Sequence, residues 1–127
     1  MCGIAGLYTK SPALRAELGE HLAAMLEQLS FRGPDSAGVA FYRDPAPPGS
    51  CKVSLCAAAG ADWGALGEEL ACAFGEVSPP SVRASHATFT VAAAAEDVQA
   101  WLAEHHGELR LMSAGTAIEI YKEAGPP

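Results

Sequence analysis

Hydrophobic and polar positions near the start of the chain follow two different periods. A short apolar run flanked by glycines comes first and is typical of a buried strand. Leucine and methionine then recur at helical spacing on one face, after a Ser11-Pro12 pair that is typical of a helix start. The expected elements are a strand over residues 4–8, a helix over 11–30, a turn over 32–36 and a strand over about 37–43.

A proline-rich break at residues 44–50 separates this segment from the rest. Three prolines in seven residues cannot continue a sheet or a helix, so we expect a linker. Beyond it, Cys51, Val53 and Leu55 alternate with polar positions, as in a half-buried strand. The further elements expected are a helix over 63–74, a strand over 86–91, a helix over 98–105, and strands over 109–113 and 117–122. The order, close to βα–ββαββ or βαββαβ, resembles a ferredoxin-like α+β unit.

Composition and charge exclude several classes of protein. Half of the 127 residues are hydrophobic and 18% are charged, so the chain can bury a core. A net charge of -7 with eight Lys and Arg argues against binding to nucleic acid or to an anionic membrane surface. No apolar run reaches the roughly 18 residues that cross a bilayer, and there is no signal-peptide pattern. The four cysteines form no C-x-x-C pair, so we expect a reducing cytoplasm.

The first residues suggest covalent chemistry. Cysteine is small enough that Met1 is expected to be removed, which would leave Cys2 with a free α-amine. Such an amine has a pKa of about 7.7 to 8, so it can accept the proton of its own residue's thiol. Gly3 would let a substrate approach the nucleophile closely. The alternative is that Cys2 is a small buried hydrophobe in a strand.

A second motif follows one helix later and favours the catalytic interpretation. Cys2-Gly3-Ile4-x-Gly6 and the segment of residues 32–38, Arg-Gly-Pro-Asp-Ser-Ala-Gly, together resemble the two N-terminal signatures of class II glutamine amidotransferases, which are N-terminal-nucleophile hydrolases. An ordinary helix-to-strand turn could account for the second motif alone, because Gly, Pro and Asp recur in turns. The resemblance covers about residues 1–43.

The resemblance implies a reaction. Cys2 would attack the side-chain amide of glutamine and form a γ-glutamyl thioester; ammonia would leave, and water would release glutamate. The turn would lie beside the N-terminus and shape the glutamine pocket in a supporting role. Its expected pocket residues are Arg32, Gly33, Asp35 and Ser36.

A finer resemblance concerns the second half of the chain. It is similar to the glutamate-synthase-like amidotransferase subunit associated with N-methylglutamate synthase, in which an α+β unit is inserted into the catalytic domain. This implies partner synthase subunits that carry FMN and iron–sulfur clusters and receive the ammonia. In this chain itself we expect no cofactor and no metal, because its cysteines lack cluster spacing. The expected segments are the start of the amidotransferase domain (1–43), a linker (44–50), the insert (51–123) and a truncated tail (124–127).

Parts of the family's active site have no counterpart in this sequence. The arginine segment that holds the glutamine carboxylate is not found, and the sequence contains no asparagine for the usual oxyanion hole. The family's four-layer αββα sandwich would also be incomplete, since two strands and one helix cannot cover both sides of a sheet pair. We therefore expect a truncated piece of a longer enzyme that is inactive alone.

Two alternatives remain open at this point. Residues 51–123 could form a non-catalytic α+β regulatory or docking module that binds a partner without Cys2. The chain could also belong to an N-terminal-nucleophile hydrolase that acts on a different amide. The histidines do not favour a metal site, because His105 and His106 are adjacent and should point in different directions.

Overall fold

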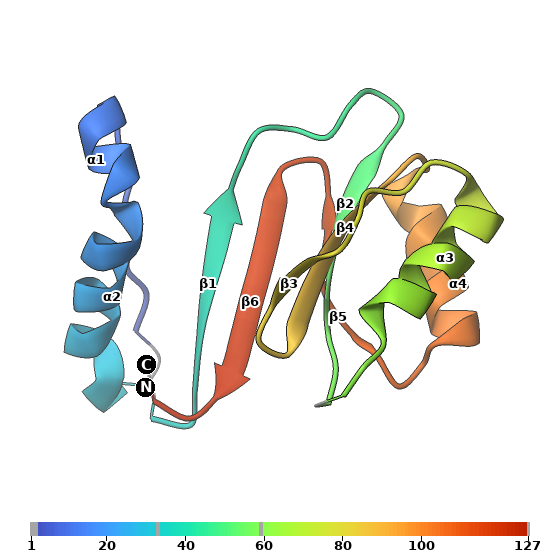
Figure 1. Cartoon of the computed structure of the whole chain (residues 1–127). Coiled ribbons are helices and arrows are strands. Elements are labelled where there is room, and N and C mark those ends of the chain that lie inside the picture. The colour runs from blue at the N-terminus through green and yellow to red at the C-terminus, as the bar shows by residue number, and fades with distance from the viewer. Residues whose placement is uncertain (1–2, 33, 59, 127) are drawn as a thin grey trace. The chain divides into compact units, whose positions relative to one another are not determined.

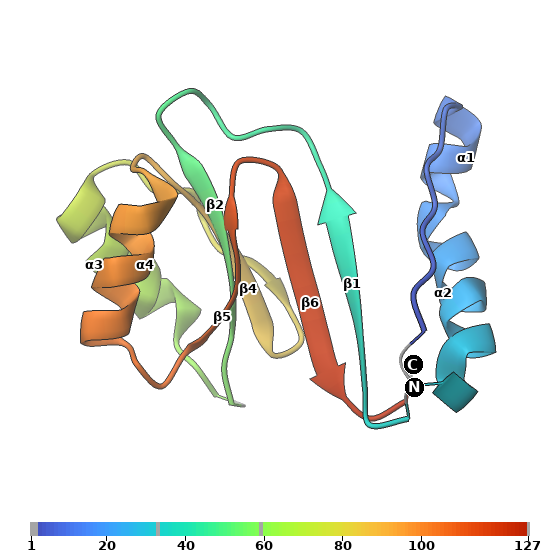
Figure 2. The same ribbon diagram turned by 180° about the vertical axis from the view of Figure 1, so that it is seen from behind.

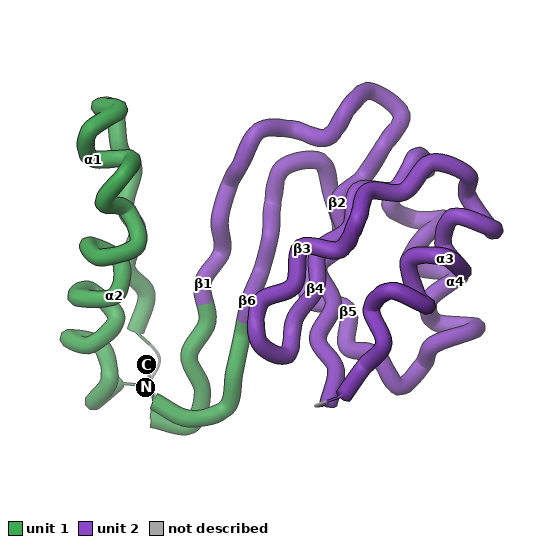
Figure 3. Tube along the Cα trace, viewed as in Figure 1, with its two compact units in different colours: residues 1–38, 122–127 green, residues 39–121 purple. Residues whose placement is uncertain are grey.

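The computed structural model describes residues 3–32, 34–58 and 60–126. Helices and strands are both abundant, so the predicted α+β class is confirmed. The described chain divides into two compact units (Figure 3), which we call unit 1 (residues 1–38 and 122–127) and unit 2 (residues 39–121). Strands β1 (Ser36–Tyr42) and β6 (Ile118–Ala124) form a two-stranded sheet and contribute residues to both units.

The helical part of unit 1 follows the predicted span but is interrupted. Helix α1 covers Pro12–Ala16, α2 covers Leu18–Leu29, and a 3-10 turn, η1, covers Ser30–Arg32. Ser11 occupies the N-cap position of α1 with extended backbone angles, and Pro12 follows it in the first turn, as the sequence predicts. The Ser11 side chain makes no capping hydrogen bond, so proline geometry rather than side-chain capping favours this start.

The predicted strand over residues 4–8 is wrong. Residues 3–10 have no regular secondary structure, and Ile4 is 95% exposed. A strand forms by exchanging backbone hydrogen bonds with a neighbour, and apolar composition alone does not supply one. None of the described residues of unit 1 is buried, so this run is not part of a core in the described structure.

Unit 2 has the β-α-β-β-α-β element order of a ferredoxin-like unit. Its elements are β2 (Cys51–Cys56), α3 (Trp63–Phe74), β3 (Ser81–Arg83), β4 (His86–Val91), α4 (Ala95–His105) and β5 (Arg110–Gly115). The strands lie in the order β3-β4-β2-β5, and every neighbouring pair is antiparallel. Both helices cover the same face of this sheet (Figures 1 and 2).

The core of unit 2 lies between the sheet and its two helices. It is built from the inward positions of β2 and β4 and from one face of α3 and α4. Phe89 is fully buried and Trp63 nearly so, while Phe74 and Trp101 pack edge to face at the margin with ring centroids 6.0 Å apart. These four aromatic residues therefore belong to one cluster.

Strand β2 is buried at every position except Lys52, including its polar positions, which corrects its expected half-buried character. Ser54 is fully buried, and its hydroxyl shares a 3.0 Å hydrogen bond with the hydroxyl of Thr88 on β4. The Thr88 hydroxyl is also 3.3 Å from the hydroxyl of Tyr121 on β6. Polar side chains can be buried when they are hydrogen-bonded to one another, so an alternating pattern need not mean an exposed face.

Candidate functional site

The described chain begins at Gly3, and the end of α2 together with η1 packs against this residue. A Cβ atom placed on Gly3 would lie 3.0 Å from Leu29 Cδ2 and 3.3 Å from Arg32 Cβ. These distances are shorter than ordinary van der Waals contact, so the N-terminal segment passes directly over η1. The sequence-predicted residues Cys2 and Gly33 lie outside the described residues.

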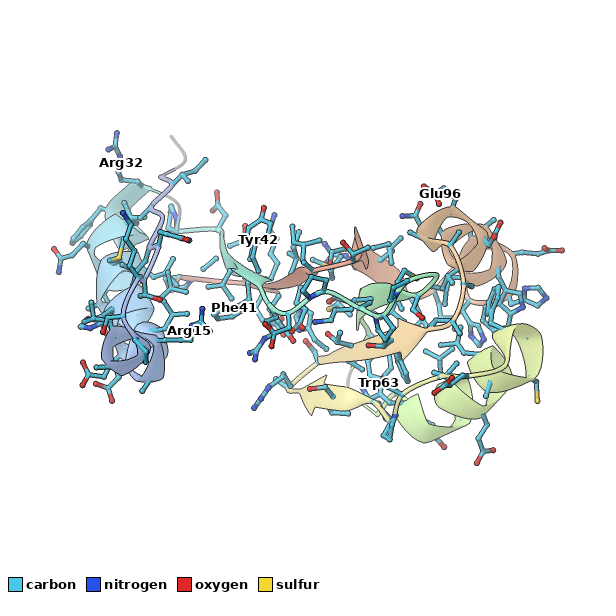
Figure 4. All side chains as sticks on the ribbon, turned by 90° about the horizontal axis from the view of Figure 1, so that it is seen from above. Arg15, Arg32, Phe41, Tyr42, Trp63 and Glu96 are labelled. Carbon is cyan, nitrogen blue, oxygen red and sulfur yellow. The ribbon has the colours of Figure 1, made fainter. Side chains whose placement is uncertain are left out.

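The position of Arg32 follows from the way α2 ends. Ser30 is the C-cap of α2; its backbone N–H and its hydroxyl both donate to the carbonyl of Glu27, the hydroxyl at 2.6 Å. The chain then tightens into the 3-10 turn that carries Arg32. The Arg32 side chain is exposed and projects from the end of this segment (Figure 4). A guanidinium group is thereby presented beside the start of the chain.

Asp35 lies in the bend that leads into β1, Ser36 is the first residue of that strand, and both are exposed. The carbonyl of Asp35 accepts a 2.8 Å hydrogen bond from the N–H of Gly125, whose φ of +105° favours glycine. Among the described residues, no side-chain hydrogen bond joins Asp35 or Ser36 to Arg32. The structure thus brings Arg32 to Gly3 and gives Asp35 a backbone role in closing the turn.

A polar cluster in unit 2 was not anticipated from the sequence. The Glu119 carboxylate accepts from Lys52 Nζ at 3.2 Å and from the Tyr121 hydroxyl at 3.1 Å, and it lies 3.1 Å from Arg43 Nε. The Glu119 side chain is 9% exposed. The sequence pattern that could have indicated this cluster lies in β6, where Glu119 and Tyr121 alternate with isoleucine. Because that pattern also fits an ordinary amphipathic strand, it does not single out a buried carboxylate.

The described residues contain no metal-ligand cluster. In residues 3–32, 34–58 and 60–126, no group of three His, Cys, Asp or Glu side chains is arranged to hold an ion. His105 Nδ1 lies 2.9 Å from the carbonyl oxygen of Trp101, whereas His106 Nε2 lies 2.9 Å from Glu69 Oε2. Their ring nitrogens therefore have different hydrogen-bond partners, although both rings pack against Trp101. Over the same described residues, no helix is long and apolar enough to cross a membrane.

The cysteines of unit 2 differ in accessibility. Cys51 and Cys56 are buried and Cys72 is exposed, and all three are free thiols. Burial raises the pKa of the Cys51 thiol above its ordinary value, and the nearby charge of Glu96 adds to this effect. Cys51 is thus held as a neutral core side chain, while Cys72 is the accessible thiol of this unit.

Comparison with known proteins gives one informative similarity. No protein-family profile matches the chain, and no solved structure matches it. A curated relative, the glutamine amidotransferase-like protein GlxB of Rhizobium meliloti (strain 1021), is 43% identical over 129 residues. The alignment covers 100% of this chain and 42% of the relative, so the chain spans less than half the length of the protein that it matches. Throughout its length, then, the chain is similar to part of a glutamine amidotransferase-like protein.

Proposed function

We propose that this chain is the nucleophile-bearing portion of a class II glutamine amidotransferase. After removal of Met1, the α-amine of Cys2 accepts the thiol proton, directly or through one water. The thiolate attacks the side-chain amide carbon of glutamine, and the carbon–nitrogen bond breaks to release ammonia and leave a γ-glutamyl thioester. Water then cleaves the thioester, which releases glutamate and restores the thiol.

The observation that carries this proposal is the 43% identity to a glutamine amidotransferase-like protein along the entire chain. The alignment includes the whole first segment, in which the Cys2 motif and the residue 32–38 motif stand one helix apart. The close approach of Gly3 to Arg32 supports the same assignment, because it places the second motif beside the residue that follows the nucleophile. On this proposal Arg32, Gly33, Asp35 and Ser36 help to shape the glutamine pocket.

The remaining parts of the site would come from sequence beyond this chain. The relative is more than twice as long as the matched region, which leaves room for a carboxylate-binding arginine and an oxyanion-hole donor. We propose that the chain alone lacks useful turnover, and that in the complete enzyme ammonia passes to glutamate-synthase-like subunits in the cytoplasm. The FMN and iron–sulfur clusters would be carried by those partners rather than by this chain.

A domain exchange tests the proposal. The matched region of the Rhizobium relative is replaced by this chain, and the chimera is incubated with 6-diazo-5-oxo-norleucine, a glutamine mimic that alkylates the nucleophile. The chimera and its Cys2→Ala control both carry Cys72→Ser, because Cys72 is an exposed thiol that would add background. Intact mass should show loss of Met1 and one adduct, with glutamine slowing the labelling.

The matched control is the same chimera with Cys2→Ala, which should form no adduct and release no ammonia from glutamine. The unmodified relative serves as the reference for labelling. Retention of Met1, or an adduct that persists in Cys2→Ala, would refute Cys2 as the nucleophile. Labelling that glutamine does not slow would point instead to a hydrolase for another amide.

A docking module remains the second candidate, and one observation favours it. The hydrophobic core of the described chain lies entirely within unit 2, between Cys51 and Leu102. A unit with its own core can serve as an independent binding domain. Partner binding that survives both Cys2→Ala and removal of unit 1 would favour this function over glutamine hydrolysis.

A further inference from the structure

A polar pocket of about 190 Å³ lies within unit 2. Its lining residues Lys52, Thr88 and Thr90 alternate along β2 and β4 with core residues, so the pocket lies on the face of the sheet opposite the core. Residues from separate parts of the chain line it: Arg43 beyond β1, Lys52 on β2, Arg83 at the end of β3 and Tyr121 on β6. The fold therefore brings together side chains that are up to 78 positions apart in the sequence.

The pocket concentrates positive charge in an acidic protein. The chain has a net charge of -7 and eight Lys and Arg residues, and three of these eight line this pocket. Glu119 is the one carboxylate in the lining. The pocket thus has a surplus of two positive charges, and a cleft with one sign of charge raises the local concentration of ions of the opposite sign.

Glu119 positions two of the cations and leaves them with unused donors. It lies 3.1 Å from Nε of Arg43, which leaves the two terminal nitrogens of that guanidinium available for another acceptor. Lys52 donates to Glu119 and to the carbonyl of Asp44, and an ammonium group has three protons. The Lys52 side chain is only 14% exposed, so its position is well defined.

Arg83, the third cation, differs from the other two in its surroundings. Within the described residues, the Arg83 guanidinium makes no hydrogen bond or ion pair, and neither do the hydroxyls of Ser81 and Thr90 in the same lining. Arginine presents its donors in a planar fork that matches carboxylate and phosphate oxygens. An oxyanion between Arg83 and Arg43 would satisfy donors that the protein itself leaves unused.

We propose that this pocket binds a compact dianion, either a small dicarboxylate or a phosphate. The surplus of two positive charges matches two negative charges on the ligand. The volume lies below the roughly 300 to 1,000 Å³ of pockets for drug-sized ligands, which favours a small ion over a nucleotide or a polymer. This site is separate from Cys2 and does not depend on glutamine hydrolysis.

The test is a titration of the full chain with sodium phosphate and, separately, with succinate, each at constant ionic strength set with chloride. Amide chemical shifts from NMR should change saturably at the lining residues, with one binding site. Arg83→Gln should weaken binding about tenfold or more, because it removes a charge-assisted hydrogen-bond donor. The matched control is Arg110→Gln, which removes an exposed arginine of β5 outside the pocket and should leave the affinity unchanged.

The two titrations show which kind of dianion the pocket prefers. Tighter binding of succinate identifies a dicarboxylate site, and tighter binding of phosphate identifies a phosphate site; either result supports the proposal. Shifts that grow linearly without saturation would overturn it. Equal weakening by Arg83→Gln and Arg110→Gln would also overturn it, because it would show a non-specific effect of net charge.

Discussion

At the scale of single residues, a substitution of Gly3 tests whether the contact between Gly3 and Arg32 is needed for the site. In Gly3→Ala, the new methyl group would lie 3.0 Å from Leu29 Cδ2 and 3.3 Å from Arg32 Cβ. The leucine terminus can move, but the Arg32 Cβ is fixed to the backbone, so the turn must shift. We expect changed NMR amide shifts at Arg32 and, in the chimera, about tenfold or more slower labelling of Cys2, since small misplacements near a nucleophile are costly.

Gly19→Ala provides the matched control for this prediction, because Gly19 lies in α2 outside both N-terminal motifs. A Cβ on Gly19 would meet no atom within 4 Å, so the substitution adds the same methyl group without crowding. Both the Arg32 shift and the labelling rate should remain as in the parent protein. If Gly3→Ala behaves like Gly19→Ala, the contact between Gly3 and η1 does not matter for the site.

The buried Cys51 thiol makes the free energy of unfolding depend on pH in the alkaline range. Its folded-state pKa lies above the ordinary value of 9.0, chiefly because of burial. Between these two pKa values the Cys51 thiol has lost its proton in the unfolded chain but keeps it in the folded chain. The free energy of unfolding is therefore not lowered by this thiol below about pH 9, and it falls as the pH rises above that value. Urea unfolding at pH 8 and pH 10 should show a larger loss for the parent than for Cys51→Ala.

The control for the pH prediction is Cys72→Ala. Cys72 is exposed, and its removal should preserve the parent's loss of stability between pH 8 and pH 10. Other groups that titrate in this range are shared by all three proteins and cancel in the comparison. An identical pH dependence in the parent and in Cys51→Ala would contradict the assignment.

At the scale of elements, the two helices of unit 2 begin differently. Asp62 is the N-cap of α3, and its carboxylate accepts a 3.0 Å hydrogen bond from the N–H of Ala65. Asp62→Ala should lower the free energy of unfolding by about 0.5 to 2 kcal/mol, because that N–H loses its acceptor. Urea unfolding measures this change, and Asp62→Asn, which keeps an oxygen acceptor, should retain most of the stability.

Helix α4 offers the opposite experiment. Ala94 is its N-cap, with extended backbone angles and no side chain to accept a hydrogen bond. Ala94→Ser should raise the free energy of unfolding by about 0.5 to 1 kcal/mol, since serine can accept from the first turn. Urea unfolding beside the parent checks this, and a destabilised variant would show that the exposed position is more constrained than its geometry indicates.

The elements that could be predicted from sequence are those with a strong period of their own. The helix over 63–74 and the strand over 86–91 match α3 and β4, because each combines a regular apolar pattern with clear breaks. The three-residue strand β3 was missed, since all its side chains are exposed and carry no pattern. The expected strand over 4–8 failed for the converse reason: its residues are apolar, yet pairing is a long-range property.

At the scale of the whole molecule, long-range contacts account for what the sequence could not predict. The pattern of β2 correctly identified one core face, but not that Ser54 on the other face is fully buried. The Ser54 hydroxyl is hydrogen-bonded to that of Thr88, which in turn lies beside the hydroxyl of Tyr121; these two residues are 34 and 67 positions away from Ser54 in the sequence. The pocket around Glu119 has the same origin, because its cations come from three separate segments. Cys2 stays a prediction from the two motifs, because it lies outside the described residues, whereas the contact between Arg32 and Gly3 could be found only from the coordinates.

The two units should also differ in their free energies of local unfolding. Every core residue lies in unit 2, whereas no described residue of unit 1 is buried. Local stability follows buried apolar contacts, so amide hydrogen exchange should be slower in β2, β4 and α3 than in α2 by at least about tenfold.

Leu70→Ala removes a fully buried side chain of α3 and should lower the free energy of unfolding by about 2 to 5 kcal/mol. Exchange measured by mass spectrometry should then accelerate throughout unit 2 and stay unchanged in α2. Acceleration of both by the same factor would show instead that the units unfold together, and that α2 gains its stability from the core of unit 2.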